Sequence, residues 1–571
     1  MDNINMNHNE SKSLNSVGRE QDFPMIVFEI SNDEERFVFL VWVLMVSDEE
    51  ACKGKEFLIQ HHPSFRVLWN LLSRLHLCTV IVEDHYVDWV YRDSYYFYYS
   101  SKHFNYSRFC KRLCIFSGAL EKEFYDCTSE ELGKRFIGSI VIRPIPGRSI
   151  GRTLLAPRYF LPERELCQIR LAKYKITVYG KQLTVEAFPY SMQDGETTSC
   201  AEITILNLLD YYSRSYPEYR YLLPSEISKL AELNSYERRM PTTGLSYELI
   251  SKIFCEVGFY PRLYSAQKMT KTKFRHILYY YIESGIPVAL GLKQGPEAKH
   301  SIIIVGHKAT DENTLGKEIT GVYDQETDDT IWTCDIADTV DTYCIMDDNR
   351  EPYQLSSCIE EKQMKEQSGL LKLNHCEIEY MMVPLYKRMI MEAADAYDIC
   401  LSILASKKLG IKDFLLMSCF FEGVMTAERT ELKLGTKEMP IVMRLFMASS
   451  RTFRKKRDEQ FRKENREVRD LYNITVFPKF VWICEITTKE LHKKGLVIGE
   501  IVLDATSSAE VKTDSFIIIH YPNVICRRMP EDYSEAKNIQ FEKINAWLPF
   551  ERFDGNLENV VGQVRRINDN D

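Results

Sequence analysis

The pattern of apolar and polar residues divides the chain into short strands and amphipathic helices. Apolar runs at 25–30, 78–82 and 136–143 predict β-strands, because each is short and rich in β-branched residues. Residues 65–75 and 202–212 instead repeat apolar side chains three and four positions apart, which is the spacing of one helix face. Strands and helices are interspersed without an internal repeat, so we predict the α+β fold class.

The same signals continue toward the C-terminus. The segment 93–100 is rich in Tyr and Phe and could be a recognition surface, but these residues favour a pleated surface, so we predict a strand. Residues 342–346 form an apolar run that ends in the polar turn 347–349. Further expected elements are buried strands within 284–292 and 299–307, helices near 387–407 and 451–471, and strands at 480–485 and 496–506.

A chain of 571 residues is too long for one hydrophobic core, so a multidomain organisation is expected. Shifts in composition suggest the boundaries. We predict a disordered tail at 1–21, an N-terminal α+β domain at 22–180, a central domain at 181–355, a polar connection at 356–384, and a C-terminal α+β domain at 385–571 with a possible role in recognising substrate or partner.

Composition and charge exclude several classes of protein. The net charge of −9 and pI near 5.9 argue against a general nucleic-acid binder, which usually presents a basic face. The longest apolar run, 37–46, has ten residues, whereas a bilayer-crossing helix needs about twenty. We therefore expect neither nucleic acid nor membrane as a partner.

The cysteines point to a reducing compartment. There are sixteen, scattered among apolar segments as buried thiols would be, and the first twenty residues lack the apolar stretch of a secretion signal. A cytoplasmic location is therefore expected. Cys110 and Cys114 have no second pair of ligands nearby, and no phosphate-cradling glycine motif is present. We predict no metal and no cofactor.

One cysteine differs from the others in its setting. Cys200 follows a polar, turn-forming stretch and directly precedes the predicted helix 202–212. A thiol at a helix N-terminus meets free backbone N–H groups and the positive end of the helix dipole, which favour the nucleophilic thiolate. Upstream, Gln193 could supply an amide donor to a developing oxyanion. Cys200 is thus a candidate nucleophile.

A thiol nucleophile needs a base within hydrogen-bond reach and a third group that orients the base. His300 opens the predicted strand 299–307, and Asp347 and Asp348 end the strand at 342–346. His307 is a rival base, although it lies beyond Gly306 at the expected strand end. The order Gln, Cys, His, Asp along the chain therefore contains every part of a cysteine hydrolase site.

Residues 185 to about 355 resemble the papain-like cysteine peptidases, nearest to the bacterial bacteriocin-processing type. The resemblance is carried by Gln193, by Cys200 with its neighbours, by the strand that starts at His300, by the turn at 347–348, and by 241–246 leading into a helix. It implies a Cys-bearing helix packed on an antiparallel sheet that carries the histidine and the aspartate. It further implies Cys200 as nucleophile, His300 as general base, Asp347 as orienter and Gln193 in the oxyanion hole.

The chain departs from that family at three points. Cys200 follows Gln193 by seven positions, one more than is usual, which leaves Asp194 at the family's position. Ala201 replaces the common glycine. The doublet of Asp347 and Asp348 leaves the third member open, because neighbouring strand residues point to opposite faces and only one of the two would meet the histidine.

Two charged features have two interpretations each. Arg143, Arg148 and Arg152 surround one turn and could clamp an anion, but pairing with nearby acids is the simpler interpretation. Residues 451–470 mix basic and acidic side chains and could contact nucleic acid, but such a mixture is more typical of a solvated helix face.

These observations predict a cysteine-dependent hydrolase that cleaves a peptide, isopeptide or related amide bond in a protein or peptide substrate. Two alternatives remain open. The same triad could transfer the acyl group to an amine, as a transglutaminase does, or the core could be a catalytically dead scaffold that binds a partner. The sequence makes no prediction of the oligomeric state.

Overall fold

The computed structural model describes most of the chain. The described residues are 25–120, 122–234, 244–294, 298–309, 314–324, 329–359, 372–373, 376–406, 409–410, 434–508, 515–522, 524–529, 539–544 and 549–563. The predicted tail at 1–21, residues 241–243 of the family-like segment and much of the predicted connection at 356–384 lie outside them. Helix and strand each account for about 35% of the structure, which confirms the α+β class and the presence of several sheets.

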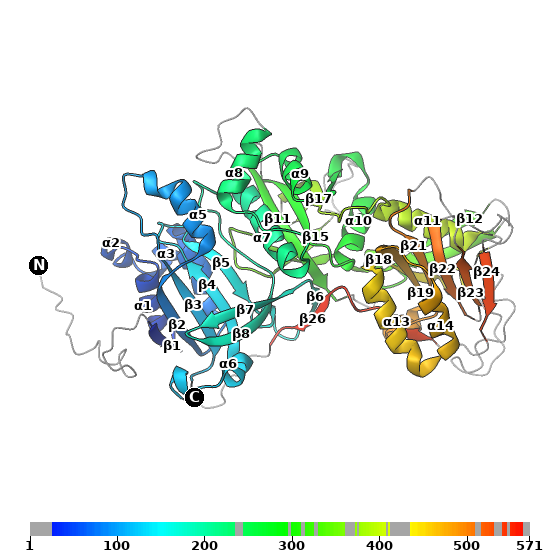
Figure 1. Ribbon diagram of the computed structural model, residues 1–571, viewed down its shortest axis with the longest axis horizontal. Coiled ribbons are helices and arrows are strands. Elements are labelled where there is room, and N and C mark those ends of the chain that lie inside the picture. Colours follow the sequence, from blue (N-terminus) through cyan, green and yellow to red (C-terminus); the bar gives the residue numbers. More distant parts are fainter. Residues whose placement is uncertain are drawn as a thin grey trace, which may run out of the picture.

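Three sheets follow one another along the long axis of the molecule (Figure 1). The first is a five-stranded antiparallel sheet in which the strands pair in chain order, from β1 to β5. Its strands are β1 (Met25–Ile30), β2 (Cys78–Tyr86), β3 (Cys110–Ser117), β4 (Phe136–Ile142) and β5 (Ile150–Leu155). Its helices are α1 (Asp33–Val43), α2 (Asp48–Ala51), α3 (Lys55–His61), α4 (Pro63–Ser73), α5 (Trp89–Phe97) and α6 (Ser129–Arg135).

The prediction of a strand at 93–100 is wrong, because this segment belongs to α5 and the short 3-10 helix Tyr99–Ser101. The Asp88 side chain caps α5 by accepting a hydrogen bond from the backbone N–H of Tyr91 at 2.8 Å. Tyr91, Tyr95 and Tyr99 recur every four residues, and their rings lie 5.9–6.4 Å apart on one helix face. A good cap and a helical spacing of aromatic rings therefore outweigh the β-propensity of single residues.

The central sheet closes on itself. Strands β10, β11, β14, β15, β16 and β17 form an antiparallel ring, because β10 pairs with both β11 and β17. The ring is called the central barrel below. Its strands are β10 (Val288–Gln294), β11 (Ala298–Lys308), β14 (Thr342–Met346), β15 (Gln354–Ile359), β16 (Lys372–Leu373) and β17 (Cys376–Val383). Closure fixes the relative register of all six strands.

Other elements pack on the central barrel. Strand β9 (Arg262–Ser265) pairs with β17, and β6 (Leu166–Ile169) pairs with β11. The strand β26 (Glu558–Val561), close to the end of the chain, pairs with β6 in the middle of the molecule (Figure 1). The helices are α7 (Cys200–Ser215), α8 (Pro224–Leu233), α9 (Tyr247–Glu256) and α10 (Lys271–Glu283), and β7 (Ala172–Val178) and β8 (Lys181–Ala187) form a separate hairpin.

The third sheet has eight strands and takes two of them, β12 and β13, from the middle of the chain. β13 pairs with β18 in parallel, whereas the other neighbours are antiparallel. The strands are β12 (Thr320–Asp324), β13 (Asp329–Asp335), β18 (Ile441–Ser449), β19 (Phe480–Thr487), β21 (Gly499–Asp504), β22 (Phe516–Tyr521), β23 (Val524–Arg528) and β24 (Ile539–Lys543). Hydrogen bonding between strands therefore crosses the predicted boundaries at 180, 355 and 385.

The remaining elements of this third region are helices and a small two-stranded sheet. The helices are α11 (Ala393–Ala405), α13 (Ser450–Glu464), α14 (Arg466–Ile474) and α15 (Lys489–Lys493), and the small sheet consists of β20 (Leu496–Val497) and β25 (Phe550–Glu551). Among the described residues, no helix has both the length and the apolar character that crossing a membrane requires.

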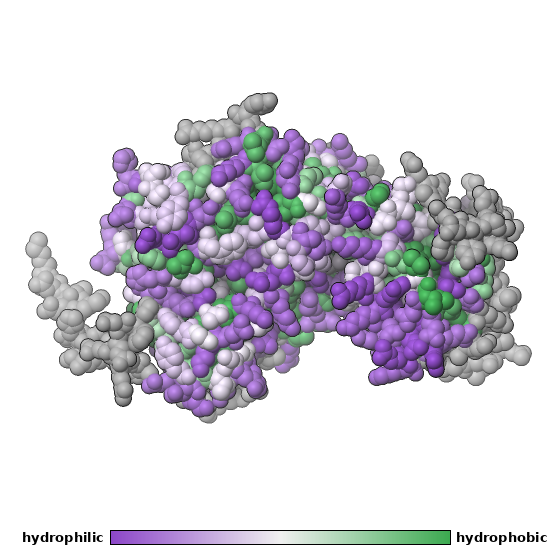
Figure 2. Space-filling model, in the orientation of Figure 1, coloured by the Kyte–Doolittle hydropathy of each residue, from purple (hydrophilic) through white to green (hydrophobic). Residues whose placement is uncertain are grey.

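The mixed-charge helix α13 is solvated on only part of its surface. Figure 2 shows hydrophilic residues covering the region of α13 and α14. Arg457 is the exception, since its side chain is only 1% exposed and binds Glu500 at 2.5 Å and Glu485 at 3.2 Å. Arg444 on β18 also binds Glu485, at 2.6 Å. The helix is therefore anchored on the third sheet by a buried network of ions, which a count of charges along the sequence cannot reveal.

We expect Arg457→Met to lower the free energy of unfolding by about 3–5 kcal/mol, because it leaves the buried Glu500 carboxylate without its cation and Glu485 with Arg444 alone. Arg466→Met on α14 is the matched control, since the Arg466 side chain is 84% exposed, and its effect should stay within about 0.5 kcal/mol. Urea unfolding followed by circular dichroism measures both. Equal effects of the two substitutions would contradict the anchoring role of Arg457.

Candidate active site

Cys200 is the first residue of α7, as the sequence predicted. The backbone N–H of Ser199 donates to Glu202 at 3.0 Å, and the Ser199 hydroxyl binds the same carboxylate, so the start of the helix is well defined. Cys200 itself is partly exposed, whereas most of the described cysteines are buried. The thiol therefore combines access from outside with a position at the positive end of a helix of 16 residues.

The loop before Cys200 is held by its own polar groups. The Asp194 carboxylate accepts hydrogen bonds from the backbone N–H groups of Glu196, Thr197 and Thr198 at 2.7–2.9 Å. Gly195, with φ at +77°, supplies the left-handed backbone conformation that this tight turn needs. With its oxygens occupied in this way, Asp194 is a structural residue of the loop, even though it stands at the family's usual glutamine position.

Two arginines of the cluster around residues 143–152 bind groups of the loop or of α7. Arg143 donates to the backbone oxygens of Ile150 and Met192 at 3.1 and 2.9 Å and lies 3.8 Å from the Asp194 carboxylate. Arg152 is paired with Asp210 at 2.6 Å. Both arginines therefore have internal partners, in agreement with the simpler of the two interpretations of the cluster.

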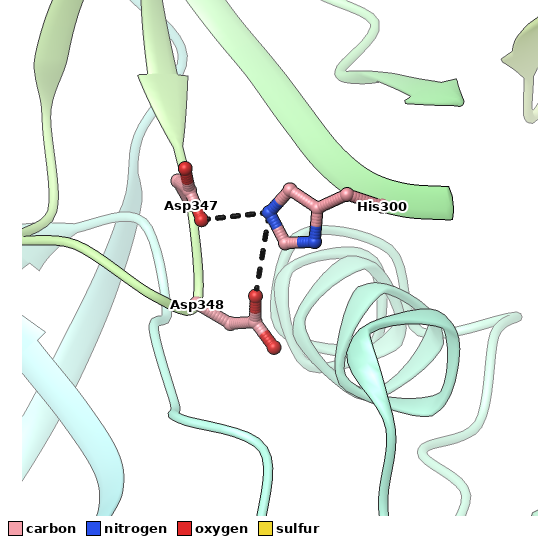
Figure 3. A group of neighbouring side chains, drawn as sticks. All are labelled: His300, Asp347 and Asp348. Carbon is pink, nitrogen blue, oxygen red and sulfur yellow. Dashed lines mark hydrogen bonds and ion pairs between the residues drawn. The ribbon is translucent and has the colours of Figure 1, made fainter. Parts of the chain in front are cut away.

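His300 connects the thiol to a carboxylate. Its Nε2 lies 2.8 Å from Asp347 Oδ1, and its side chain is only 6% exposed. Burial lowers the pKa of the imidazole, but hydrogen bonds to Asp347 and Cys200 and the charges of both aspartates outweigh burial and raise the pKa to about 10. Because Nε2 faces Asp347, the other ring nitrogen remains for the thiol, and Figure 3 shows it turned away from both aspartates.

Both aspartates lie beside the ring, contrary to the expectation that only one could. Figure 3 shows Asp347 and Asp348 on the same side of His300, and Asp348 Oδ1 is 3.7 Å from Nε2. The expectation assumed an extended strand, but β14 ends at Met346 and the two residues lie in the following turn. Side chains in a turn need not alternate between faces. Asp347 makes the hydrogen bond to the ring, and Asp348 lies farther from the same ring nitrogen.

The pKa values of the two carboxyl groups shift in opposite directions. The hydrogen bond and charge of His300 outweigh burial and hold the pKa of Asp347 below its usual value. Burial raises the pKa of Asp348 to about 7; the His300 charge and the backbone N–H of Gln193 oppose this shift, and the Asp347 charge adds to it. Neighbouring carboxyl groups with separated pKa values are characteristic of functional sites.

Asn349, which the sequence analysis did not single out, joins several parts of the site. Its backbone N–H donates to Asp347 at 3.0 Å, and its side-chain oxygen accepts from Gln193 at 3.2 Å and from Arg148 at 3.0 Å. Arg66 in the first region donates to its backbone oxygen at 3.2 Å. Gln193 therefore lies beside the turn that carries the aspartates, and its oxyanion role stays a prediction.

The nucleophile helix is attached directly to the histidine strand. The Thr204 hydroxyl lies 2.9 Å from the backbone oxygen of Cys200 and 3.0 Å from the hydroxyl of Ser301, the residue after His300. These two contacts connect the first turn of α7 to β11. They hold the start of α7, which carries the thiol, beside the strand that carries the imidazole. Thr204 follows Cys200 by about one helical turn, and this spacing could have been found in the sequence.

Tyr247, the first residue of α9, closes one side of the site. Its hydroxyl is 3.5 Å from the backbone oxygen of His300, and the negative form of Cys200 adds to the burial that raises the Tyr247 pKa. The ring lies against Gly291 on β10, where an added Cβ would come within 1.9 Å of the Tyr247 hydroxyl oxygen. Only a glycine at position 291 leaves room for this ring, and no pattern in the sequence indicates that a glycine is required there.

His307, the rival base, is occupied elsewhere. Its Nε2 binds Glu283 at 2.7 Å and its Nδ1 lies 2.7 Å from the backbone oxygen of Lys308. The residue is fully buried. With both ring nitrogens engaged, His307 cannot serve Cys200.

The same groups could also hold a divalent cation. The ligand atoms of His300, Asp347 and Asp348 lie within 4.8 Å of one another, and one imidazole with two carboxylates is a set that zinc accepts. A cation there would displace the hydrogen between Nε2 and Asp347, because those two atoms are at hydrogen-bond distance. Proton and metal therefore compete for one position.

We expect Asp347→Asn to lower the imidazole pKa of His300 from about 10 toward the ordinary histidine value of 6.5. The substitution removes the carboxylate whose hydrogen bond and charge favour the charged ring. Asp348→Asn is the matched control and should lower it less. Carbon NMR of histidine-labelled protein across pH measures both, with His300→Gln identifying the signal. An unchanged pKa in Asp347→Asn would contradict the pairing.

The raised pKa of His300 also determines how its contribution to the stability of the fold depends on pH. Since the folded-state pKa of His300 is raised, the stabilisation is fully present below about pH 6.5 and is lost as the pH rises through about 10.

No protein-family model matches this chain, and no curated protein matches its sequence.

Proposed function

We propose that this protein is a cysteine-dependent hydrolase of a peptide, isopeptide or related amide bond. The observation that carries the proposal is the position of His300, which is hydrogen-bonded to Asp347 through Nε2 and whose pKa is also raised by the thiol at the start of α7. That is the combination of nucleophile, base and orienting group that thiol catalysis requires. A helix bearing the cysteine, packed on an antiparallel barrel that bears the histidine, supports a papain-like core.

The first half of the reaction begins with the thiol proton on His300. An imidazole pKa of about 10 keeps that proton on the ring at neutral pH, so the thiolate of Cys200 attacks the carbonyl carbon and forms a carbon–sulfur bond. The carbonyl electrons move to oxygen, and backbone N–H groups at the start of α7 stabilise the oxyanion, with Gln193 as the proposed side-chain donor. The oxyanion then collapses, and the leaving amine takes the proton from His300.

The second half releases the acyl group. His300, now neutral, takes a proton from water while the water oxygen attacks the thioester carbon. Collapse of this second tetrahedral intermediate expels the sulfur of Cys200 and yields a carboxylic acid. Asp347 stays ionised throughout and holds the charged ring in place, as its lowered pKa favours.

We expect iodoacetamide to label Cys200 faster than Cys255, although Cys255 is the more exposed thiol. The reason is that thiolate reacts and thiol does not, and His300 favours the thiolate. Mass spectrometry of partially labelled protein gives the two rates. His300→Ala should slow labelling of Cys200 and leave Cys255 unchanged. Labelling of Cys200 no faster than that of Cys255 would favour a dead scaffold.

We expect Cys200→Ala to reduce hydrolysis of an unfolded protein such as casein by about a thousandfold or more without changing the unfolding curve. Cys255→Ala is the control and should keep full activity, and excess EDTA should not inhibit the wild-type protein. Adding a primary amine separates hydrolysis from acyl transfer, since a transferase would incorporate the amine into product. Full activity in Cys200→Ala would rule out the mechanism.

A further inference from the structure

The segment 89–109, which contains α5, lies directly beside the nucleophile loop. Lys102 pairs with Glu196 of that loop at 2.8 Å, and the hydroxyls of Ser94 and Thr197 are 3.5 Å apart. On its other side, Asp93 holds the start of α8, where it accepts from both the N–H and the hydroxyl of Ser225 at 2.8 Å. A ligand bound on this segment would therefore lie next to the loop that leads to Cys200.

The outer face of the segment combines exposed aromatic rings with arginines. It consists of Arg92, Tyr96, Phe104, Arg108 and Phe109, and is called the Tyr96 surface below. Phe104 is 67% exposed and Tyr96 is 59% exposed. Both guanidinium groups lie over the ring of Phe109, at 5.3 and 5.1 Å from its centroid.

The two arginines of the Tyr96 surface have no acidic partner among the described residues, and all of their ring contacts are within the surface itself. The neighbouring acids are engaged elsewhere. Asp88 caps α5, Asp93 binds Ser225 and Glu196 pairs with Lys102. Of the five residues of the Tyr96 surface, only the two arginines are charged, in a chain whose net charge is −9.

We propose that the Tyr96 surface binds an acidic segment of the substrate, so that the enzyme selects proteins with clustered Asp and Glu near the cleaved bond. Guanidinium groups bind carboxylates through paired hydrogen bonds, and aromatic rings beside them fix their planes and exclude water. This inference rests on the proposed hydrolase function. A nucleic acid is disfavoured, because two arginines offer few phosphate contacts and the chain as a whole is acidic.

The test measures binding with the full chain carrying Cys200→Ala, so that it does not depend on catalysis. The probes are a fluorescein-labelled peptide of alternating Glu and Gly and its Gln–Gly counterpart. We expect the Glu peptide alone to bind, more weakly at high salt, and Arg92→Gln with Arg108→Gln to weaken it about tenfold. Arg451→Gln with Arg466→Gln removes the same charge from α13 and α14 and should leave binding unchanged.

Three outcomes would overturn the inference: no binding of the Glu peptide, equal loss in the two double variants, or tighter binding of single-stranded oligothymidine that the Arg92 and Arg108 substitutions abolish. None of these three outcomes would contradict the hydrolase proposal, which is tested by Cys200 labelling and by turnover. Conversely, an unreactive Cys200 with intact peptide binding would leave the surface as a docking site of a scaffold.

Discussion

The hydrogen bond between His300 and Asp347 is the interaction on which the site depends. It joins β11 of the central barrel to the turn that follows the neighbouring strand β14, through groups that are both almost fully buried. Burial alone would make the imidazole neutral, so the charge on Asp347 decides the state of the ring. The Cys200 thiol is a further group that raises the pKa of this ring.

The surrounding fold explains why this geometry is stable. The closed ring of strands fixes the register between β11 and β14, and the Thr204 hydroxyl ties α7 to Ser301, next to the histidine. Asn349 joins the aspartate turn to the loop of Gln193 and to Arg66 in the first region. The first and the central regions of the molecule therefore both contribute to the site, although Cys200, His300 and Asp347 all belong to the central one.

The third region reaches the same barrel from the other side. Glu283, at the end of α10, binds Arg444 of β18 at 2.5 Å and His307 of β11 at 2.7 Å. The charge of Arg444 and the hydrogen bond to His307 outweigh the burial of Glu283 and hold its pKa far below its usual range. The strand that carries His300 is thus bound at its far end to Glu283, which in turn pairs with Arg444 of the third sheet. Large flanking regions can serve a small site in this way, by holding its strands in register.

The sequence by itself determined the local parts: the helix that starts at Cys200, the strand that starts at His300, the strand before Asp347 and the α+β class, because periodicity and capping act over a few residues. Only tertiary structure decided which groups meet. It engaged His307 with Glu283, brought both aspartates to one ring in a turn, gave Asn349 its partners and buried Arg457. The physical reason is that pairing, burial and pKa depend on neighbours far away in the chain, which no local pattern records.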